Sequence, residues 1–207
     1  MGPPGQVVIL NGAPRSGKTS ICRALQARGP GDWVNLGADA SVGSLPERLQ
    51  PGIGLRPGGE RPDLEGTVVL LYGALFDAVA AHAGRGLDVV VDAGLHEGYS
   101  RPLGILPLCA RLLEGLPVLF VGVRCPLEVI WQRRRESWGQ DEATADDSLR
   151  RAVERWQDVV HAAVAYDLEV DTSILAPAQC ADLIATRVAD GPPGVAFERL
   201  ADRGVHP

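Results

Sequence analysis

Lysine is almost absent from this chain. Lys18 is the only lysine among 20 basic residues, and every other one is an arginine. Arginine binds oxyanions through a planar fork, whereas lysine offers a compact ammonium that fits between phosphate oxygens. A sequence that keeps a single lysine therefore indicates a position where arginine cannot replace it. Lys18 lies in the run Gly12-Ala13-Pro14-Arg15-Ser16-Gly17-Lys18-Thr19, which has the spacing of a phosphate-binding P-loop.

A surplus of positive charge is also missing. The formal net charge is −6 and the isoelectric point is near 5.2, so the chain lacks the basic face typical of nucleic-acid-binding proteins. No apolar run approaches the ~18 residues that span a bilayer, and no signal sequence opens the chain. We therefore expect a cytoplasmic protein that has no nucleic-acid or membrane partner and acts on a small soluble substrate. The sequence leaves its oligomeric state open.

Paired cysteines are missing as well. The chain has 4 cysteines, which lie far apart and lack the spacing of zinc sites or redox motifs. They are Cys22, Cys109, Cys125 and Cys180. We expect isolated, reduced thiols.

The length of 207 residues suits one α/β domain, which we expect at residues 1–190, followed by a flexible tail at 191–207. Five apolar runs with helical patterns between them predict a parallel sheet with crossover helices. The expected strands are 6–10, 33–37, 87–92, 116–123 and 166–171. The expected helices are 18–28, 64–84, 127–135, 147–165 and 177–189.

One of the expected helices and one of the connecting segments have distinctive residue patterns. The helix 147–165 carries apolar residues at steps of three and four, which predicts a stripe packed against the sheet as core. The stripe comprises Leu149, Val153, Trp156, Val160 and Ala163. By contrast, residues 51–62 are rich in glycine and proline and predict a surface loop, within a substrate loop at about 39–64.

The P-loop has the surroundings that its function requires, with an apolar strand before it and a helix after it. A chance glycine turn that caps an ordinary helix would leave the solitary lysine unexplained. Lys18 can reach the β- and γ-phosphates of a nucleotide, and the Thr19 hydroxyl is suited to Mg²⁺. The expected nucleotide-binding residues here are Gly12, Ala13, Pro14, Arg15, Ser16, Gly17, Lys18, Thr19 and Ser20.

Two aspartates at strand ends are candidates for the remaining chemistry. Asp92 closes an apolar strand, as the second magnesium partner of a P-loop does, and its alternative role is a helix cap. Asp39 follows the second strand and could accept the proton of an attacking hydroxyl, or cap the helix that begins near Ala40.

The arginine run Arg133-Arg134-Arg135 precedes a polar segment that has the character of a lid, at about residues 133–146. Consecutive helical residues point about 100° apart, so we expect one or two of the three to contact phosphate and the others to face solvent. Arg124 at the end of the fourth strand fits a structural ion pair better than a nucleotide contact. Tyr166, Trp33 and Trp138 fit packing better than ring stacking on a ligand.

Four segments together resemble the chloramphenicol phosphotransferase family over nearly the whole chain. They are Val8-Ile9-Leu10-Asn11-Gly12, the segment 33–39, Val121-Gly122-Val123-Arg124-Cys125 and Tyr166-Asp167-Leu168-Glu169-Val170-Asp171-Thr172. The resemblance implies a three-layer P-loop kinase fold with a five-stranded parallel sheet of order 2-3-1-4-5 and a lid segment. It also implies ATP- and Mg²⁺-dependent phosphorylation of a hydroxyl, with chloramphenicol or a related antibiotic as acceptor and resistance as the outcome.

The resemblance carries particular roles onto particular positions. Asp39 corresponds to the catalytic base, Asp92 to the magnesium-side aspartate and Arg133 to the lid arginine. Asp171 and Thr172 fall where the adenine is expected. The chain departs from the family pattern at Ala93, where an acidic residue is expected, in the lid run Trp138-Gly139-Gln140-Asp141, and in the loop 51–62.

Two other functions remain open at this stage. A nucleotide-dependent switch is one, although the absence of lysine outside the P-loop rules out the guanine-reading Asn-Lys-x-Asp loop. A kinase whose acceptor is a nucleotide, a sugar nucleotide or another metabolite is the second, with Arg48, Arg56 and Arg61 available beside the expected substrate loop.

Overall fold

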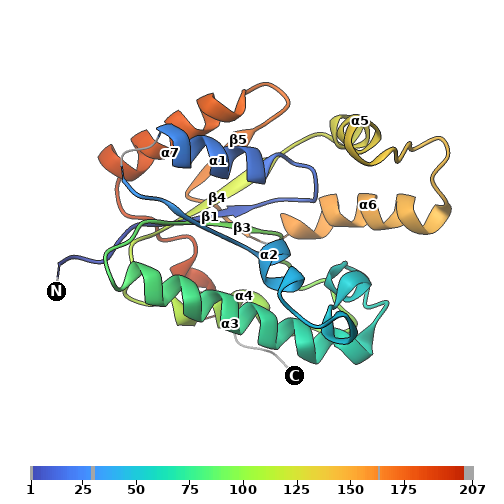
Figure 1. Cartoon of the computed structure of the whole chain (residues 1–207), viewed down its shortest axis with the longest axis horizontal. Coiled ribbons are helices and arrows are strands. Elements are labelled where there is room, and N and C mark those ends of the chain that lie inside the picture. The colour runs from blue at the N-terminus through green and yellow to red at the C-terminus, as the bar shows by residue number, and fades with distance from the viewer. Residues whose placement is uncertain (1, 29–30, 163, 203–207) are drawn as a thin grey trace.

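Five parallel strands form the middle layer of the molecule, in the order β2-β3-β1-β4-β5 (Figure 1). The computed structural model describes residues 2–28, 31–162 and 164–202. The strands are β1 (Val7–Asn11), β2 (Val34–Gly37), β3 (Val89–Ala93), β4 (Val118–Arg124) and β5 (Leu168–Asp171). This order and the parallel pairing confirm the expected P-loop kinase fold.

Helices cover both faces of the sheet. One face carries α1 (Lys18–Arg28) and α7 (Pro177–Asp190), and the other carries α3 (Glu65–Ala83) and α4 (Ile105–Leu112). Beyond the carboxyl ends of the strands lie α2 (Ala38–Gly43), α5 (Leu127–Trp138) and α6 (Asp147–Val160) (Figure 1). Four 3₁₀ turns complete the elements: η1 (Glu47–Leu49), η2 (Gly52–Leu55), η3 (Pro62–Leu64) and η4 (Glu198–Leu200).

The central strand β1 is buried along its whole length, because helices cover it from both sides. Successive side chains of a strand point to opposite faces. Val7 and Ile9 accordingly join the core under α3 and α4, whereas Val8 and Leu10 join the core under α1 and α7. The uninterrupted apolar run of β1 is thus what a doubly covered strand needs.

The C-terminal segment differs from the expected flexible tail. Within residues 191–202, Phe197 is 1% exposed, and its ring lies 5.0 Å from that of Phe120 and 6.0 Å from that of Phe76. Ala196 and Leu200 are buried beside it. The Pro-Pro-Gly run ends α7, but the apolar residues after it fill the core on the α3–α4 side. Residues 203–207 lie outside the described part of the chain.

Helix α3 corrects the expectation that no apolar run is long enough to cross a membrane. By length and composition, the 22-residue segment Pro62–Ala83 could do so. In the structure one side of this segment is core, with Val68, Phe76 and Val79 completely buried. Leu70 on the other side is 75% exposed. The apolar composition of this segment is therefore that of a core helix, one side of which packs under the sheet.

Helix α6 does not pack against the sheet as its stripe predicts. Val153 and Val160 cluster with Ile130 and Trp131 of α5, and Leu149 and Trp156 pack at the edge of this cluster. Ala163 lies outside the described residues. The stripe faces α5 and the space at the carboxyl end of the sheet. The three- and four-residue spacing therefore correctly predicts an apolar face, but it does not predict which element this face contacts.

Candidate functional site

The run Gly12–Thr19 forms a tight loop between β1 and α1. Gly17 has φ +98°, which is the left-handed region that glycine adopts without strain. Gly12 is required for another reason, because a Cβ there would lie 2.6 Å from the carbonyl oxygen of Val123 on β4. The loop therefore brings its backbone N–H groups and the N-terminus of α1 to one place, which is an arrangement suited to anions.

Lys18 is held inside this loop. Its side chain is buried, and Nζ donates to the carbonyl oxygens of Gly12 at 2.9 Å and of Ala13 at 3.1 Å. Nζ also lies 3.6 Å from Asp92 Oδ1. The ammonium thus lies where several oxygens converge, in the space that a compact cation fills.

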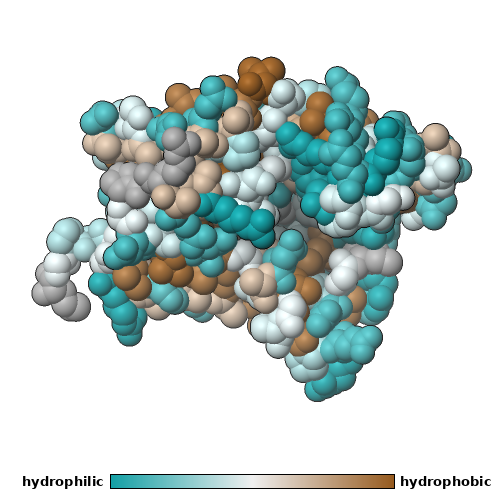
Figure 2. Space-filling model, turned by 45° about the horizontal axis from the view of Figure 1, so that its top comes forward, coloured by the Kyte–Doolittle hydropathy of each residue, from teal (hydrophilic) through white to brown (hydrophobic). Residues whose placement is uncertain are grey.

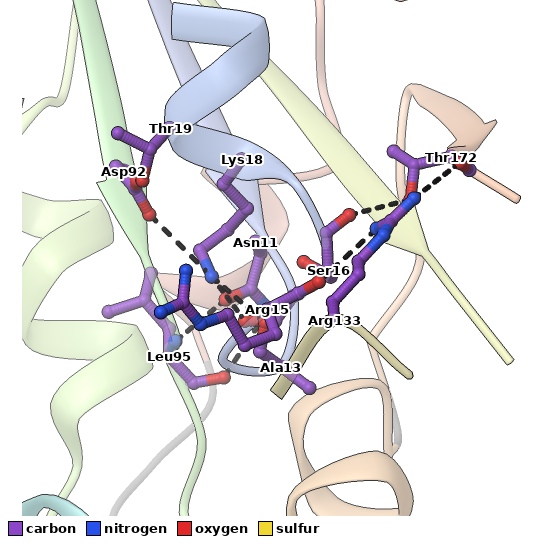
Figure 3. A network of polar contacts seen from close by, with 11 residues as sticks. Asn11, Ala13, Arg15, Ser16, Lys18, Thr19, Asp92, Leu95, Arg133 and Thr172 are labelled. Carbon is purple, nitrogen blue, oxygen red and sulfur yellow. Dashed lines mark hydrogen bonds and ion pairs between the residues drawn. The ribbon is translucent and has the colours of Figure 1, made fainter. Parts of the chain in front are cut away.

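Asp92 also joins the loop to the neighbouring strand. The Thr19 hydroxyl donates to Asp92 Oδ2 at 2.5 Å, so a hydroxyl from α1 meets a carboxylate from β3 (Figure 3). Mg²⁺ takes oxygen ligands and often uses only one or two from the protein besides phosphates and waters. This pair of oxygens fits such a site, although the described residues contain no larger cluster of metal-ligating side chains.

Arg133 lies on the other side of the loop from Asp92 (Figure 3). Its guanidinium donates to the Arg15 carbonyl at 3.2 Å, to Thr172 Oγ1 at 3.0 Å and to the Thr172 carbonyl at 2.7 Å. Thr172 in turn donates to the Ser16 carbonyl at 2.6 Å. These bonds connect α5, the loop and the end of β5, so in this structure Arg133 holds the loop against both elements.

The other two arginines of the run point elsewhere. Arg135 is exposed and pairs with Asp141 at 2.6 Å. Arg134 is only 8% exposed and donates to Gln140 Oε1 at 2.9 Å. The three side chains point in different directions, as the helical geometry predicts, but Arg134 turns inward and is buried instead of facing solvent as expected.

Trp138 connects Arg134 to the loop. The guanidinium carbon of Arg15 lies 3.7 Å from the centre of the Trp138 ring, and that of Arg134 lies 4.9 Å from it. Both contacts have cation–π geometry. Trp138 is the last residue of α5, so the beginning of the expected lid rests directly on the side chain of Arg15.

Two cavities meet at the loop. The α1 cavity, of about 480 Å³, is lined by the start of α1 and by residues including Arg133, Thr172 and Pro177. The α6 cavity, of about 340 Å³, is lined by α6, η2 and α3. Among the residues that the structure describes, five line both cavities: Pro14, Lys18, Asp39, Asp92 and Trp138. In Figure 2 hydrophilic residues gather over α5, and a hollow lies beneath them.

Asp39 lies at the seam of these cavities, in the first turn of α2. Its carboxylate is exposed, and no hydrogen bond or ion pair joins it to another residue in the described part of the chain. Burial lowers the pKa of the nearby Arg15, and the negative charge of Asp39 raises it. Asp39 can therefore accept a proton from a group that enters the α6 cavity.

The remaining predicted residues differ in their surroundings. Ser20 and Thr172 line the α1 cavity, and so do Leu175 and Pro177, which the sequence analysis did not single out. Asp171 is not among the lining residues, and its carboxylate accepts from the backbone and hydroxyl of Ser173 at 2.8 and 2.6 Å. Of the three arginines beside the expected substrate loop, Arg56 lines the α6 cavity, Arg61 pairs with Asp63 on the surface, and Arg48 is exposed.

The alternatives favoured for the other polar and aromatic candidates agree with the structure. Arg124 pairs with Glu169 at 2.8 Å at the sheet edge. Trp33 is buried in the core. The Tyr166 ring packs on Phe120, and its hydroxyl accepts from Asn11 Nδ2 at 3.1 Å.

His96 is a buried residue that the sequence analysis missed, and it contacts two residues that line the α6 cavity, Leu55 and Trp156. It is 1% exposed, its Nδ1 accepts from the Gly98 N–H at 3.1 Å, and its Nε2 therefore donates to the Leu55 carbonyl at 3.1 Å. Its ring stacks on Tyr99 and meets Trp156 edge-on, with centres 4.3 and 4.9 Å apart. Burial lowers the pKa of His96 to about 4. A neutral histidine thus fixes η2 against α6 behind the α6 cavity.

Comparisons with known proteins agree with this geometry. The family model described as "Chloramphenicol phosphotransferase-like protein" matches residues 5–189, and the chain therefore belongs to that family. The expected class of enzyme, a phosphotransferase with an alcohol group as acceptor, agrees with this membership. The protein named "Putative O-phosphotransferase Rv2636" from Mycobacterium tuberculosis (strain ATCC 25618 / H37Rv) is 26% identical over 97% of this chain and 90% of its own length.

Solved structures with a similar fold are more distant in sequence. A tunicamycin resistance protein from Deinococcus radiodurans is 19% identical, with a TM-score of 0.59 over 89% of this chain and 96% of its own. A sugar kinase from Janibacter sp. HTCC2649 is also 19% identical, with a TM-score of 0.59 over 97% and 100% of the two chains. The APS kinase CysC of Mycobacterium tuberculosis, solved with AMPPNP and APS, has 19% identity and a TM-score of 0.57 over 88% and 96%. These likenesses establish the fold.

Proposed function

We propose that this member of the family is an ATP-dependent kinase that phosphorylates a hydroxyl group of a small molecule. The α1 cavity binds the nucleotide phosphates, and the α6 cavity binds the acceptor. The observation that carries this proposal is the boundary shared by the two cavities, because Lys18, Asp39 and Asp92 line both of them. A phosphoryl group that passes from one cavity to the other would move between these three side chains.

The loop is the phosphate-binding element of the proposal. Its N–H groups and the N-terminus of α1 attract phosphate oxygens, and Lys18 neutralises the negative charge that spreads over the transferring group. Thr19 and Asp92 would hold Mg²⁺, whose contribution is to offset the charge of the phosphates. Arg133 acts here as a positioning residue rather than as the expected lid arginine, because its Nη1 and Nη2 atoms already donate to the loop and to Thr172.

Asp39 is the proposed general base. A hydroxyl in the α6 cavity would give its proton to this carboxylate and attack the γ-phosphorus from the side facing the cavity, while the bond from the γ-phosphorus to the β–γ bridging oxygen breaks and ADP leaves. In transfers of this kind, positioning and charge neutralisation supply most of the catalysis.

A screen for acceptors tests this proposal. The chain is incubated with Mg²⁺, ATP and single hydroxylated compounds, and mass spectrometry reports any gain of one phosphoryl group. The family relationship makes chloramphenicol and related antibiotics the first compounds, and nucleoside monophosphates form a separate arm. Phosphorylation of a hydroxyl in any arm supports the proposal. Steady ATP hydrolysis without a phosphorylated product in all arms would contradict it.

A further inference from the structure

We infer that the acceptor carries an oxyanion, a carboxylate or a phosphate, which binds between Arg56 and Arg134 in the α6 cavity. This inference rests on the proposed function and deepens it, because it assigns a chemical class to the acceptor. Both arginines line the α6 cavity, and neither lines the α1 cavity.

Arg134 is the first support. A guanidinium that is 8% exposed has lost most of its hydration, yet its buried Nε meets no acceptor among the described residues. Its one hydrogen bond goes to a neutral amide, that of Gln140, and it forms no ion pair within the described part of the chain. A buried cation without a counter-charge is costly, and an anion in the cavity would compensate it.

Arg56 is the second support, from a different segment of the chain. It follows η2 on the loop at 51–62, is half-buried and has no hydrogen bond or ion pair with any described residue. Burial lowers the pKa of Arg134, and the charges of Arg56 and Arg15 lower it further. Three arginines that repel one another, Arg134 of α5, Arg56 of the loop 51–62 and Arg15 of the P-loop, therefore lie in one region. Planar guanidinium groups bind carboxylates and phosphates through paired hydrogen bonds.

The aspartates nearby do not neutralise this pair. Asp92 is engaged with Thr19 and Lys18, and the charge of Asp39 acts on Arg15. Both carboxylates lie at the seam with the α1 cavity, whereas the two arginines lie on the acceptor side only. The α6 cavity is thus acidic where the hydroxyl reacts and basic where the rest of the acceptor lies.

The other walls of the α6 cavity are largely apolar. They include Leu55, Tyr72, Val153 and Trp156. A volume of about 340 Å³ falls at the lower end of the range for small-molecule sites. The acceptor that fits is a small molecule with an apolar body, a hydroxyl at the Asp39 end and an oxyanion at the arginine end.

NMR spectroscopy tests this inference directly. The full chain is labelled with ¹⁵N-arginine, and the Nε–H signal of Arg134 is assigned from its loss in Arg134→Gln. Benzoate and the neutral, similarly sized benzamide are titrated at constant ionic strength. We expect a saturable shift of the Arg134 signal with benzoate and none with benzamide. An Arg134 signal that does not shift with benzoate, or that shifts equally with both compounds, would overturn the inference.

A kinetic measurement supplies the second arm. For a hydroxylated carboxylate or phosphate ester that the chain phosphorylates, Arg134→Gln should raise the acceptor KM about 10- to 100-fold, as expected for lost hydrogen bonds to a charged group. Arg61→Gln is the matched control, since Arg61 lies on the same loop as Arg56 but pairs with Asp63 at the surface. Equal kcat/KM for a neutral acceptor such as chloramphenicol and for anionic ones would also contradict the inference.

The two proposals fail in different ways. If no acceptor is phosphorylated but the Arg134 signal responds selectively to benzoate, the proposed kinase activity fails and the anion site stands. If neutral alcohols are phosphorylated and benzoate leaves the Arg134 signal unchanged, the kinase activity stands and the anion site fails.

Discussion

The Thr19 hydroxyl donates to Asp92 Oδ2 at 2.5 Å and thereby joins the first turn of α1 to the carboxyl end of β3. Residues 73 positions apart in sequence meet because β1 and β3 are parallel neighbours, with Leu10 opposite Asp92. The fold thus places a hydroxyl and a carboxylate at the point where a metal-bound phosphate would lie.

Asp92→Asn should lower kcat/KM for ATP by about 10²- to 10³-fold, because the amide has the same shape but lacks the charge that would hold Mg²⁺. The loss should be smaller at high Mg²⁺ concentration, where weaker binding is partly restored. Steady-state kinetics over a Mg²⁺ series measure both effects. Asp182→Asn on the exposed face of α7 is the control. Equal Mg²⁺ dependence in Asp92→Asn and wild type would remove Asp92 from the metal site.

Lys18→Arg should be as inactive as Lys18→Ala, with kcat reduced at least about 10²- to 10³-fold. Nζ is enclosed by the Gly12 and Ala13 carbonyls, and the larger guanidinium fork does not fit between them. Initial rates at saturating ATP and acceptor measure this. If Lys18→Arg keeps more than half of the wild-type rate, the solitary lysine has no special role in this chain.

Arg133→Gln should raise the KM for ATP about 10-fold and change kcat much less, because a loosened loop binds phosphates weakly but retains Lys18. Arg133 connects the Arg15 and Thr172 carbonyls, so the variant should also unfold at a lower temperature. The separation of KM from kcat is the decisive readout. A large fall in kcat with an unchanged KM would instead assign Arg133 to the transition state, as the family resemblance implies.

His96→Gln should make the stability less dependent on pH. Burial lowers the His96 pKa to about 4 in the folded chain, against 6.5 for an ordinary histidine. The neutral folded form is therefore favoured above pH 6.5, and this contribution is lost as the pH falls from 6.5 through 4. Between pH 7 and 4.5, wild type should lose about 2 kcal/mol more stability than the variant.

Urea unfolding at the two pH values measures this difference. The pKa of His161 is also lowered to about 4 by burial, so both proteins share that part of the acid response. Parallel pH profiles for wild type and His96→Gln would show that His96 is not held neutral behind the α6 cavity.

Much of the fold could be predicted from the sequence because its strongest signals are local. The apolar strands, the glycine spacing of the loop and the helix at Lys18–Arg28 all follow from residues close together in the chain. The helix at Ile105–Leu112 was missed, since Pro107 and a short apolar run gave no clear helical period. The tail was misjudged because Phe197 finds its partners, Phe76 and Phe120, only in the folded core.

The candidate site was predictable only in part. Lys18, Thr19, Asp39 and Asp92 follow from their positions at strand ends, where parallel strands bring ligand groups together. Arg133 meets Arg15 and Thr172, which are distant in sequence, so no local pattern reveals its direction. The role of His96 likewise arises from contacts with Leu55 and Trp156, which lie on distant segments of the chain.

The fate of the γ-phosphoryl group tests the central claim most directly. With γ-³²P-ATP and an acceptor from the screen, the account predicts that label passes to the acceptor, and that Asp39→Asn slows this transfer by about 10²- to 10³-fold while nucleotide binding persists. Label that appears only as inorganic phosphate, at the same rate with and without acceptor and in both proteins, would contradict it.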